Sequence, residues 1–413
     1  MVKIKAFRGI RPEKSLASQI ASLPYDVLNS EEARVEASEN PYSFLHIDKA
    51  EIDLDPELTQ YDPKVYQKAH DNLADFLEKQ WLQKETKPAL YLYELTMKGQ
   101  SQLGLVTVTF VTDYLEGKIK KHELTRADKE IDRINHIEAC NANTSPIFLT
   151  YRDNYEVKTI TKNWVNTHDA EYDFTSYYDV THKIWVIDDT HVIDQLTALF
   201  ETNIPALYIA DGHHRTESAV KVGQKRIQAE GNDTEAPYQN FLSVLFPKEE
   251  LRIFDYNRVL NIPITEQHLA DLNYYFDVTP KGTEAFYPQA NHTFSMFFKG
   301  KWHDVSLKEN FLEEETDTLS QLSAAIFQKY VAENIFGIED IRTDKRIDFI
   351  GGIRGLNELE SLVNQEKFTM AFALKEATMD DLLTVADNGQ IMPPKSTWFE
   401  PKLLSGLFLH DLT

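Results

Sequence analysis

The sequence contains a single cysteine, Cys140, among its 413 residues. One thiol cannot form an internal disulfide, and it cannot supply a CxxC pair or a zinc site built from several thiolates. We therefore expect an intracellular protein. No basic motif flanks Cys140, so we expect it to be a buried, inert thiol.

Long apolar runs are also missing. No window approaches the roughly 20 consecutive apolar residues that a membrane-spanning helix requires. The first ten residues alternate charged and apolar side chains and lack the continuous apolar core of a signal peptide. These absences predict a soluble, cytoplasmic protein with no membrane partner.

Basic residues are scarce relative to acidic ones. The chain has 43 Lys and Arg against 66 Asp and Glu, which gives a formal net charge of −23 at pH 7. Such an excess repels polyanions, so we expect no nucleic-acid partner. The few basic residues are partly gathered at 118–126, at Arg215 and at 395–402, which leaves room for a small, locally positive pocket sized for a nucleotide.

Several common catalytic motifs are absent. The chain has no GxxxxGK[ST], HExxH or GxSxG, and the glycines at 351–355 fit neither the phosphate loop nor the dinucleotide fingerprint. Apolar residues make up 42% and charged residues 26% of the chain. This composition excludes collagen-like, low-complexity and disordered chains. The length is enough for about two or three globular domains.

Short segments rich in β-branched and aromatic residues predict strands, and apolar residues at helical spacing predict helices. The expected strands cover residues 90–94, 104–111, 146–151, 183–187, 206–210, 241–246, 292–299 and 368–374. The expected helices cover residues 63–81, 124–137, 216–229, 265–275, 318–336, 356–364 and 379–388. We therefore predict a mixed α/β region over residues 1–260 and an α+β region over residues 261–413.

The sharpest local signal is Ala210-Asp211-Gly212-His213-His214-Arg215. A buried strand ends, a glycine allows a tight turn and a helix begins, so polar side chains and free helix N–H groups converge on an anion site. Asp211 is a candidate metal ligand, the two histidines are candidates for proton transfer, and Arg215 is a candidate clamp for phosphate or carboxylate. The alternative is a helix cap in a polar crevice.

A second signal stands at the start of the helix expected over 124–137. His122, Arg126, Lys129 and Arg133 are spaced 4, 3 and 4 and would share one polar face. Glu123 is a candidate general base for a substrate hydroxyl, or a metal ligand. The alternative is an ordinary solvated helix face.

A third signal is the segment 392–407, in which lysines, hydroxyls and rigid prolines lie close together. Lys395, Ser396, Thr397 and Lys402 suit the binding of phosphate oxygens, and Trp398 or Phe399 suits stacking on a base. The alternative is a C-terminal strand and turn docked on the core.

Six segments together carry a family resemblance that runs through nearly the whole chain. They are Arg8-Gly9-Ile10-Arg11-Pro12, Pro24-Tyr25-Asp26-Val27, His122-Glu123-Leu124-Thr125-Arg126, Asp132-Arg133, Ala210-Asp211-Gly212-His213-His214-Arg215 and residues 392–407. In order and spacing they resemble the bacterial domain of unknown function 1015, a family name that implies no reaction. Asp26 either joins the site or forms a structural Asx turn.

The strand followed by Asp-Gly-His-His-Arg also resembles, more distantly, the ParB and sulfiredoxin-like superfamily and especially its kinases for free serine. That resemblance implies a mixed-sheet core with large insertions, ATP or ADP with Mg²⁺ as cofactors, and phosphoryl transfer to free L-serine. It implies Glu123 as the base, Asp211 as the group that manages metal or phosphate, and His213, His214 and Arg215 as stabilisers of the transferred group. Sulfiredoxin chemistry is disfavoured, because its catalytic cysteine would stand where this chain has His213.

The leading hypothesis is a cytoplasmic kinase for serine or a similar hydroxy amino acid, with a small-molecule substrate and a nucleotide as its partners. His122, Arg126, Arg215 and the segment 395–402 would bind substrate or phosphate. The alternatives are a nucleotide-binding regulator without turnover and a metal-dependent phosphohydrolase. The sequence leaves open whether the chain forms a homo-oligomer.

Overall fold

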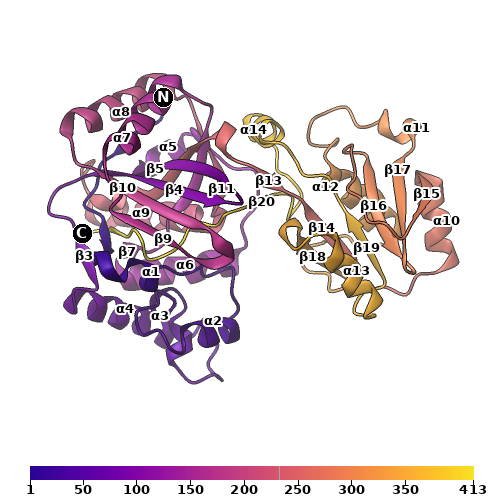
Figure 1. Ribbon diagram of the computed structural model, residues 1–413, viewed down its shortest axis with the longest axis horizontal. Coiled ribbons are helices and arrows are strands. Elements are labelled where there is room, and N and C mark those ends of the chain that lie inside the picture. The colour runs from indigo at the N-terminus through magenta and orange to yellow at the C-terminus, as the bar shows by residue number, and fades with distance from the viewer. Residues whose placement is uncertain (232) are drawn as a thin grey trace. The chain divides into compact units, whose positions relative to one another are not determined.

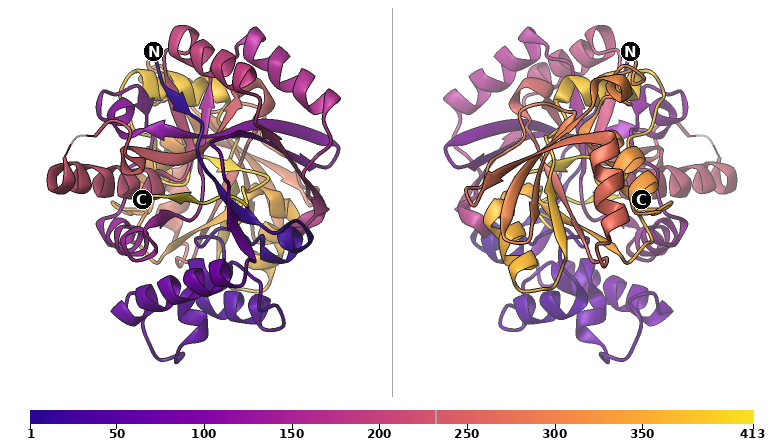
Figure 2. Two further views of the ribbon diagram at one scale, coloured as in Figure 1. Left: turned by 90° about the vertical axis from the view of Figure 1, so that its left-hand side faces the viewer. Right: turned by 90° about the vertical axis from the view of Figure 1, so that its right-hand side faces the viewer.

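The computed structural model describes residues 1–231 and 233–413, which form two compact units (Figure 1). The first comprises Met1–Lys120, Thr125–Leu251 and Pro401–Thr413, and the second comprises Lys121–Leu124 and Arg252–Glu400. Both chain termini therefore belong to the first unit (Figure 2).

The first unit is built on a nine-stranded mixed sheet. Its strands are β1 (Ile4–Lys5), β4 (Leu90–Met97), β5 (Gln100–Phe110), β6 (Ile119–Lys120), β8 (Ile147–Tyr151), β9 (Tyr172–Thr175), β10 (Thr181–Ile187), β11 (Leu207–Asp211) and β12 (Asn240–Pro247). The order is β6-β11-β8-β12-β5-β4-β10-β9, with β1 also paired to β5. The pairs β12–β8 and β11–β6 are parallel, and the others are antiparallel. This sheet confirms the predicted mixed α/β fold class.

The central strands are buried on both faces. Every residue of β8 and β12 is buried, as a strand covered on both sides of a sheet requires. The hairpin of β4 and β5 turns at Lys98 and Gly99, whose φ values are 51° and 78°. Two successive left-handed residues are what a type I′ turn requires. The prediction of strands from β-branched and aromatic content is confirmed for these elements.

The first unit also contains helices, which lie on the sheet and to one side of it. They are α1 (Ala17–Ile20), α2 (Ser30–Ala37), α3 (Leu45–Asp48), α4 (Pro63–Glu78), α5 (Val111–Leu115), α6 (Ala127–Cys140), α7 (Tyr155–Thr167), α8 (Thr190–Asn203) and α9 (His213–Glu230). Helices α2, α3 and α4 gather on one side of the unit (Figures 1 and 2). Two short ladders complete it, β2 (Ile10–Pro12) with β3 (Leu82–Lys84), and β7 (Ala142–Asn143) with β21 (His410–Asp411).

The second unit contains a six-stranded antiparallel sheet in the order β15-β17-β16-β19-β14-β18. These strands are β14 (Tyr256–Leu260), β15 (Phe276–Gly282), β16 (Thr293–Phe298), β17 (Lys301–Leu307), β18 (Ile347–Gly351) and β19 (Met370–Ala373). Its helices are α10 (Glu266–Tyr275), α11 (Glu309–Leu312), α12 (Ser323–Ile326), α13 (Leu356–Asn364) and α14 (Met379–Asp387). The strands β13 (Ile253–Phe254) and β20 (Trp398–Phe399) pair where the chain enters and leaves this unit.

Two helix predictions are wrong in part. The helix expected over 318–336 begins at Ser323 and continues as a π-helix over Phe327–Ile335. The helix expected from residue 124 begins at Ala127, so His122, Glu123 and Arg126 precede it. Its expected apolar stripe is also wrong, because Leu124 and Ile131 are 55% and 59% exposed.

The buried face of α6 is largely polar. Asp132, Arg133 and His136 are buried with Cys140, so the alternative of an ordinary solvated helix face is wrong for Arg133. Cys140 is 7% exposed, which confirms its prediction as a buried thiol, and burial raises the pKa of the thiol. The physical reason for the error is that helical spacing identifies which residues share a face without identifying which face is buried.

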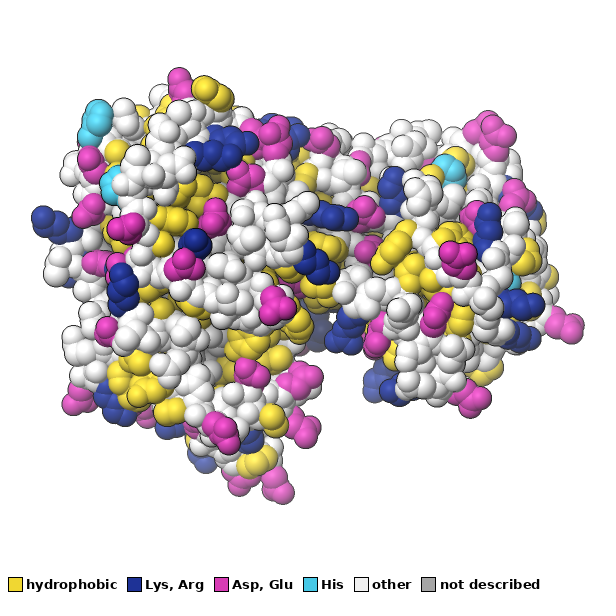
Figure 3. All heavy atoms as spheres, in the orientation of Figure 1, with side chains coloured by type: hydrophobic (Ala, Val, Ile, Leu, Met, Phe, Trp, Pro, Cys, Tyr) yellow, Lys and Arg dark blue, Asp and Glu magenta, His cyan; other side chains and the backbone are white. Residues whose placement is uncertain are grey.

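Among the described residues, no helix is long and apolar enough to cross a bilayer. On the face drawn in Figure 3, acidic and basic side chains are interspersed.

Candidate functional site

The candidate site begins where the buried strand β11 ends at Asp211. Gly212 follows with a φ of 93°, and the 18-residue helix α9 starts at His213. Residues that carry a side chain rarely adopt such a conformation. The N-cap is this glycine, so no N-cap side chain satisfies the free N–H groups of the first turn. These N–H groups and the positive end of the helix dipole favour a bound anion.

Two cations face the Asp211 carboxylate. Lys402 Nζ lies 3.4 Å and Arg215 Nη2 lies 3.6 Å from Asp211 Oδ2, and the Gly212 N–H donates to Oδ1 at 3.0 Å. Burial raises the pKa of Asp211, but Lys402 and Arg215 outweigh it and hold the pKa well below its ordinary value. The structure therefore brings Asp211 and Lys402 together, although 191 positions separate them in sequence.

Arg215 is fixed by the strand next to β11. Only 7% of the residue is exposed, and its Nη1 donates to the Pro146 carbonyl at 2.7 Å, directly before β8. A Cβ on Gly212 would lie 3.0 Å from Arg215 Nε, so the guanidinium packs directly against the residue that opens α9. The absence of a side chain at Gly212 is therefore needed for this packing as well as for the backbone conformation.

His214 joins the start of α9 to the start of α6. Its Nε2 accepts the Arg126 backbone N–H at 3.0 Å. The neutral ring therefore carries its proton on Nδ1. Burial lowers the pKa of His214, with smaller opposing contributions from Asp26 and Glu130. Ser218 Oγ on α9 donates to the Glu130 carbonyl on α6 at 3.1 Å, which adds a second link between the helices.

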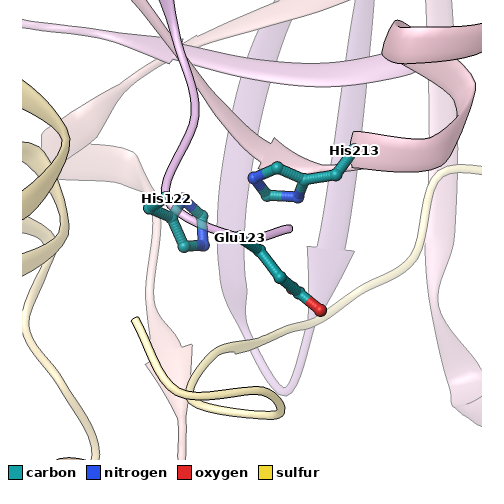
Figure 4. Close-up of side chains that lie close together, drawn as sticks. All are labelled: His122, Glu123 and His213. Carbon is teal, nitrogen blue, oxygen red and sulfur yellow. The ribbon is translucent and has the colours of Figure 1, made fainter. Parts of the chain in front are cut away.

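The residues before α6 bring a second group of side chains to α9. Figure 4 shows His122, Glu123 and His213, and one potential ligand atom from each lies within 4.8 Å of the other two. Both histidines are buried and Glu123 is half-buried. The short segment 121–124 that carries the first two residues is joined at both ends, through Lys120 and Thr125, to the first unit. Two imidazoles and one carboxylate are ligands that suit zinc, manganese or iron ions.

The predicted residues of the C-terminal segment lie in different surroundings. Thr397 Oγ1 lies 3.3 Å from His122 Nε2, and the Met392 N–H donates to the His122 carbonyl at 2.8 Å. Ser396 Oγ donates to the Pro393 carbonyl at 2.6 Å. The Lys395 carbonyl accepts from Arg258 Nη2 at 3.0 Å. Thr397 is thus placed beside His122 and Lys402 beside Asp211, while the roles of Lys395 and Ser396 stay predictions.

Tyr25 and Arg133 line one small hollow together with Arg215, a neighbourhood that helical spacing did not indicate. The Arg133 guanidinium carbon lies 4.0 Å from the centre of the Tyr25 ring, and both side chains are buried. The signal that could have found them was the resemblance, whose motifs include both Pro24-Tyr25-Asp26-Val27 and Asp132-Arg133.

The chain matches one protein family and is similar to several solved structures. The family model described as "Protein of unknown function (DUF1015)" matches residues 4–327. No curated protein matches the chain. A free serine kinase variant solved in complex with ADP is 12% identical, with 74% of this chain and 90% of that chain covered and a TM-score of 0.38.

Two further solved structures are similar at the same level. SbnI with a C-terminal truncation, from Staphylococcus aureus, is 12% identical over 73% of this chain and 85% of that chain, with a TM-score of 0.38. A conserved hypothetical protein from Pyrococcus furiosus is 13% identical over 72% of this chain and 90% of that chain, with a TM-score of 0.36. At these scores the likenesses carry no argument about this chain.

Proposed function

The chain belongs to the DUF1015 family of proteins of unknown function, and we propose that it is a nucleotide-dependent kinase for a small hydroxy amino acid such as free L-serine. One observation carries this proposal. The free N-terminus of α9, Arg215 and Lys402 converge at the end of a buried strand, and Glu123 stands close to His213 in the first turn of the same helix.

The first part of this arrangement suits the phosphates of a nucleotide. Main-chain N–H groups at a helix N-terminus bind phosphate oxygens, and Arg215 and Lys402 add positive charge beside them. Phosphoryl transfer needs mainly positioning and neutralisation of charge on the transferred group. A cluster of this kind provides both, in a chain whose overall charge of −23 would otherwise repel a nucleotide.

The second part suits activation of an alcohol. Glu123 accepts the proton of the substrate hydroxyl while the hydroxyl oxygen forms a bond to the terminal phosphorus of the nucleotide. The bond between that phosphorus and the bridging oxygen breaks, and the shortened nucleotide leaves with the electron pair. The products are the O-phospho amino acid and ADP, or AMP when ADP is the donor. His213 and Arg215 stabilise the transferred group.

The donor atoms decide which ion each group would hold. Mg²⁺ prefers oxygen ligands, which Asp211 and nucleotide phosphates offer, whereas His122, Glu123 and His213 include two imidazoles. A bound divalent cation supplies charge neutralisation on the phosphates. In this proposal Asp211 holds Mg²⁺ together with the nucleotide.

The test is direct detection of product. Purified full-length protein is incubated with L-serine, Mg²⁺ or Mn²⁺ and either ATP or ADP, and O-phosphoserine is measured by phosphorus NMR and mass spectrometry. Glu123→Gln should lower turnover about 10²–10⁴-fold, as expected when a general base is removed. Glu116→Gln, an exposed site in the turn before β6, should leave turnover unchanged. Failure to form a phospho amino acid with either nucleotide, from folded protein, excludes the kinase.

A metal-dependent phosphohydrolase is the second candidate, because the cluster of His122, Glu123 and His213 has the donor set of a transition-metal site. The same assay separates the two. A hydrolase releases inorganic phosphate equally well with or without serine, whereas the kinase requires serine. Binding of nucleotide without either product indicates a regulator.

A further inference from the structure

Asp48, the last residue of α3, is a buried carboxylate with no part in the phosphoryl transfer described above. Only 2% of the residue is exposed. Its Oδ1 accepts from the Thr144 hydroxyl at 2.8 Å, and its Oδ2 accepts from the Ser145 hydroxyl at 2.6 Å. Burial raises its pKa, but His136, Arg133 and these two hydroxyl donors outweigh burial and hold the pKa below its ordinary value. Asp48 is therefore an ionised acceptor inside the first unit.

The two hydroxyls that Asp48 binds belong to the bend between β7 and β8. Residues 144–146 lie in neither strand, so the regular hydrogen bonds of a sheet do not hold them. The bend ends at Pro146, whose carbonyl accepts from Arg215 Nη1 at 2.7 Å. Asp48 thus fixes the residues directly before the carbonyl that orients Arg215.

A second chain of hydrogen bonds runs from Ser145 to the C-terminal segment. The hydroxyl oxygens of Ser145 and Ser405 lie 2.7 Å apart. Ser145 gives its proton to Asp48, so in this pair it accepts the proton of Ser405. Ser405 is fully buried, exchanges backbone hydrogen bonds with Ser22 and follows Lys402 by three positions. Asp48 therefore also holds the segment that carries Lys402.

Packing joins α3 to the same segment independently of these hydroxyls. Gly406 has a φ of 86°, and a Cβ there would lie 2.7 Å from the Cγ atom of Phe44. Phe44 directly precedes α3 and is fully buried. A side chain at position 406 would force the Phe44 ring to move, so the start of α3 and the C-terminal segment are in direct contact.

Both cations that face Asp211 are reached from this one carboxylate. Arg215 Nη2 lies 3.6 Å and Lys402 Nζ lies 3.4 Å from Asp211 Oδ2. The first is held through the Pro146 carbonyl and the second through the C-terminal segment. Charge-assisted hydrogen bonds to phosphate depend on where the guanidinium and ammonium groups stand. The affinity for a nucleotide should therefore depend on Asp48.

We propose that Asp48 is a positioning residue of the nucleotide site, which fixes Arg215 through the bend before β8 and Lys402 through Ser405. Asp48 is itself buried and acts on the nucleotide only through these residues. This inference rests on the proposed function. It adds to the site a residue from α3, a helix that none of the sequence motifs includes.

The test compares two carboxylates of the same region. Asp48→Asn keeps the size of the side chain but removes its charge and one of its two acceptor oxygens. Asp53→Asn does the same to a carboxylate whose partners, Asn72 of α4 and His46 of α3, lie 2.8 and 2.7 Å away. Isothermal titration calorimetry of the full-length proteins with ADP and Mg²⁺ should show at least about tenfold weaker binding for Asp48→Asn, the value of one hydrogen bond to a charged group. Asp53→Asn should bind ADP as the wild type does, and measurable, equal affinity of all three proteins overturns the proposal.

A smaller substitution covers the case in which Asp48→Asn does not fold. Thr144→Val keeps the shape of the side chain but removes the hydroxyl that donates to Asp48, whereas Thr144→Ser keeps the hydroxyl. ADP should bind to Thr144→Val about threefold or more weakly than to Thr144→Ser, because a hydrogen bond to the carboxylate is lost. Measurable, equal affinities of these two variants contradict the proposal.

Spectroscopy of Arg215 separates this inference from the kinase. In protein that carries isotopically labelled arginine, the NMR signal of the Arg215 guanidinium, assigned with Arg215→Lys, reports its hydrogen bond to the Pro146 carbonyl without any nucleotide. Asp48→Asn should shift this signal, and Asp53→Asn should not. A shift in a protein that binds no nucleotide would reject the kinase and keep Asp48 as the residue that positions Arg215. An unchanged signal in Asp48→Asn overturns the inference even if the kinase assay succeeds.

Discussion

His182 and His410 are single residues whose protonation is coupled to folding. His182 is 1% exposed and lies between the Tyr93 hydroxyl, 2.8 Å from Nδ1, and the Ser176 hydroxyl, 2.7 Å from Nε2. His410 is 5% exposed, and its Nε2 lies 3.0 Å from the Pro237 carbonyl. Burial lowers the pKa of each to about 4. Both rings are therefore neutral in the folded protein at physiological pH.

The free energy of unfolding should depend on these two groups in mildly acidic solution. Each histidine binds its proton more tightly in the unfolded chain than in the folded protein. The contribution of these two histidines to the free energy of unfolding is therefore constant above about pH 6.5, and it falls as the pH drops from there toward about 4. The loss of free energy of unfolding approaches about 1.4 kcal/mol per pH unit for each histidine. For each histidine this amounts to about 3 kcal/mol between about pH 6.5 and about pH 4. Urea unfolding at pH 7, 6 and 5 measures it. His182→Gln should flatten the slope, and His191→Gln, at an exposed position, should not; parallel curves for all three proteins would contradict the pKa assignment.

Sequence reasoning succeeded at single residues where ionisable groups are dense. Four such groups within five positions, after an apolar strand, marked Asp211 to Arg215, and the structure places these residues at a strand end and helix start. It failed at Arg133, which was expected on one polar face with His122 and Arg126 but is buried against Tyr25. The difference is physical, because a strand end fixes local geometry whereas the buried face of a helix depends on what packs against it.

The start of α9 is the element on which the candidate site depends. Gly212 has a φ of 93°, and a Cβ there would lie 3.0 Å from Arg215 Nε. Gly231 ends the same helix with a φ of 103°, but a Cβ there would contact none of the described residues within 4 Å. Both glycines therefore have a positive φ, which would strain any other residue, but only Gly212 contacts Arg215.

Alanine at these two positions should separate strain from loss of the site. Both substitutions should destabilise the protein by about 1–2 kcal/mol, since a non-glycine residue is strained at positive φ. Only Gly212→Ala should also displace Arg215 and abolish nucleotide binding. Thermal unfolding and calorimetric titration with ADP measure the two effects. Equal ADP affinity for the two variants would show that Gly212 matters only for folding.

Helices and strands could be predicted where the local sequence alone determines their structure. Leu356–Asn364 was expected as a helix and is one, because its apolar periodicity is strong and its ends are clear. The π-helix over Phe327–Ile335 was expected as part of an α-helix. Its side chains follow a helical pattern, and the choice between i→i+4 and i→i+5 hydrogen bonds depends on tertiary packing.

At the scale of the whole molecule, the C-terminal segment completes the first unit. Strand β21 pairs with β7, Leu409 exchanges backbone hydrogen bonds with Ile10, and Ser405 does so with Ser22. These partners lie hundreds of residues away, so no local pattern could have indicated them. Along the sequence, most of the second unit therefore stands between two stretches of the first. The pairing of Ile253 with Phe399 joins the beginning and the end of this inserted stretch.

This connectivity predicts that the second unit can be removed while the last thirteen residues cannot. A variant in which a Gly-Ser linker of about four residues replaces residues 253–399 should fold, because antiparallel pairing brings the flanking chain ends close together. A second variant that also lacks 401–413 should not fold. It would lose six buried side chains: Leu403, Leu404, Leu407, Phe408, Leu409 and Leu412.

The expected energies separate these variants clearly. At about 1.5–3 kcal/mol for each buried side chain, the tail contributes about 9–18 kcal/mol, which matches or exceeds the roughly 5–15 kcal/mol of a typical domain. Circular dichroism with urea unfolding should show a cooperative transition for the first variant and none for the second. Cooperative unfolding of both would mean that the tail is dispensable. Loss of folding in both would mean that the first unit depends on the second for its stability.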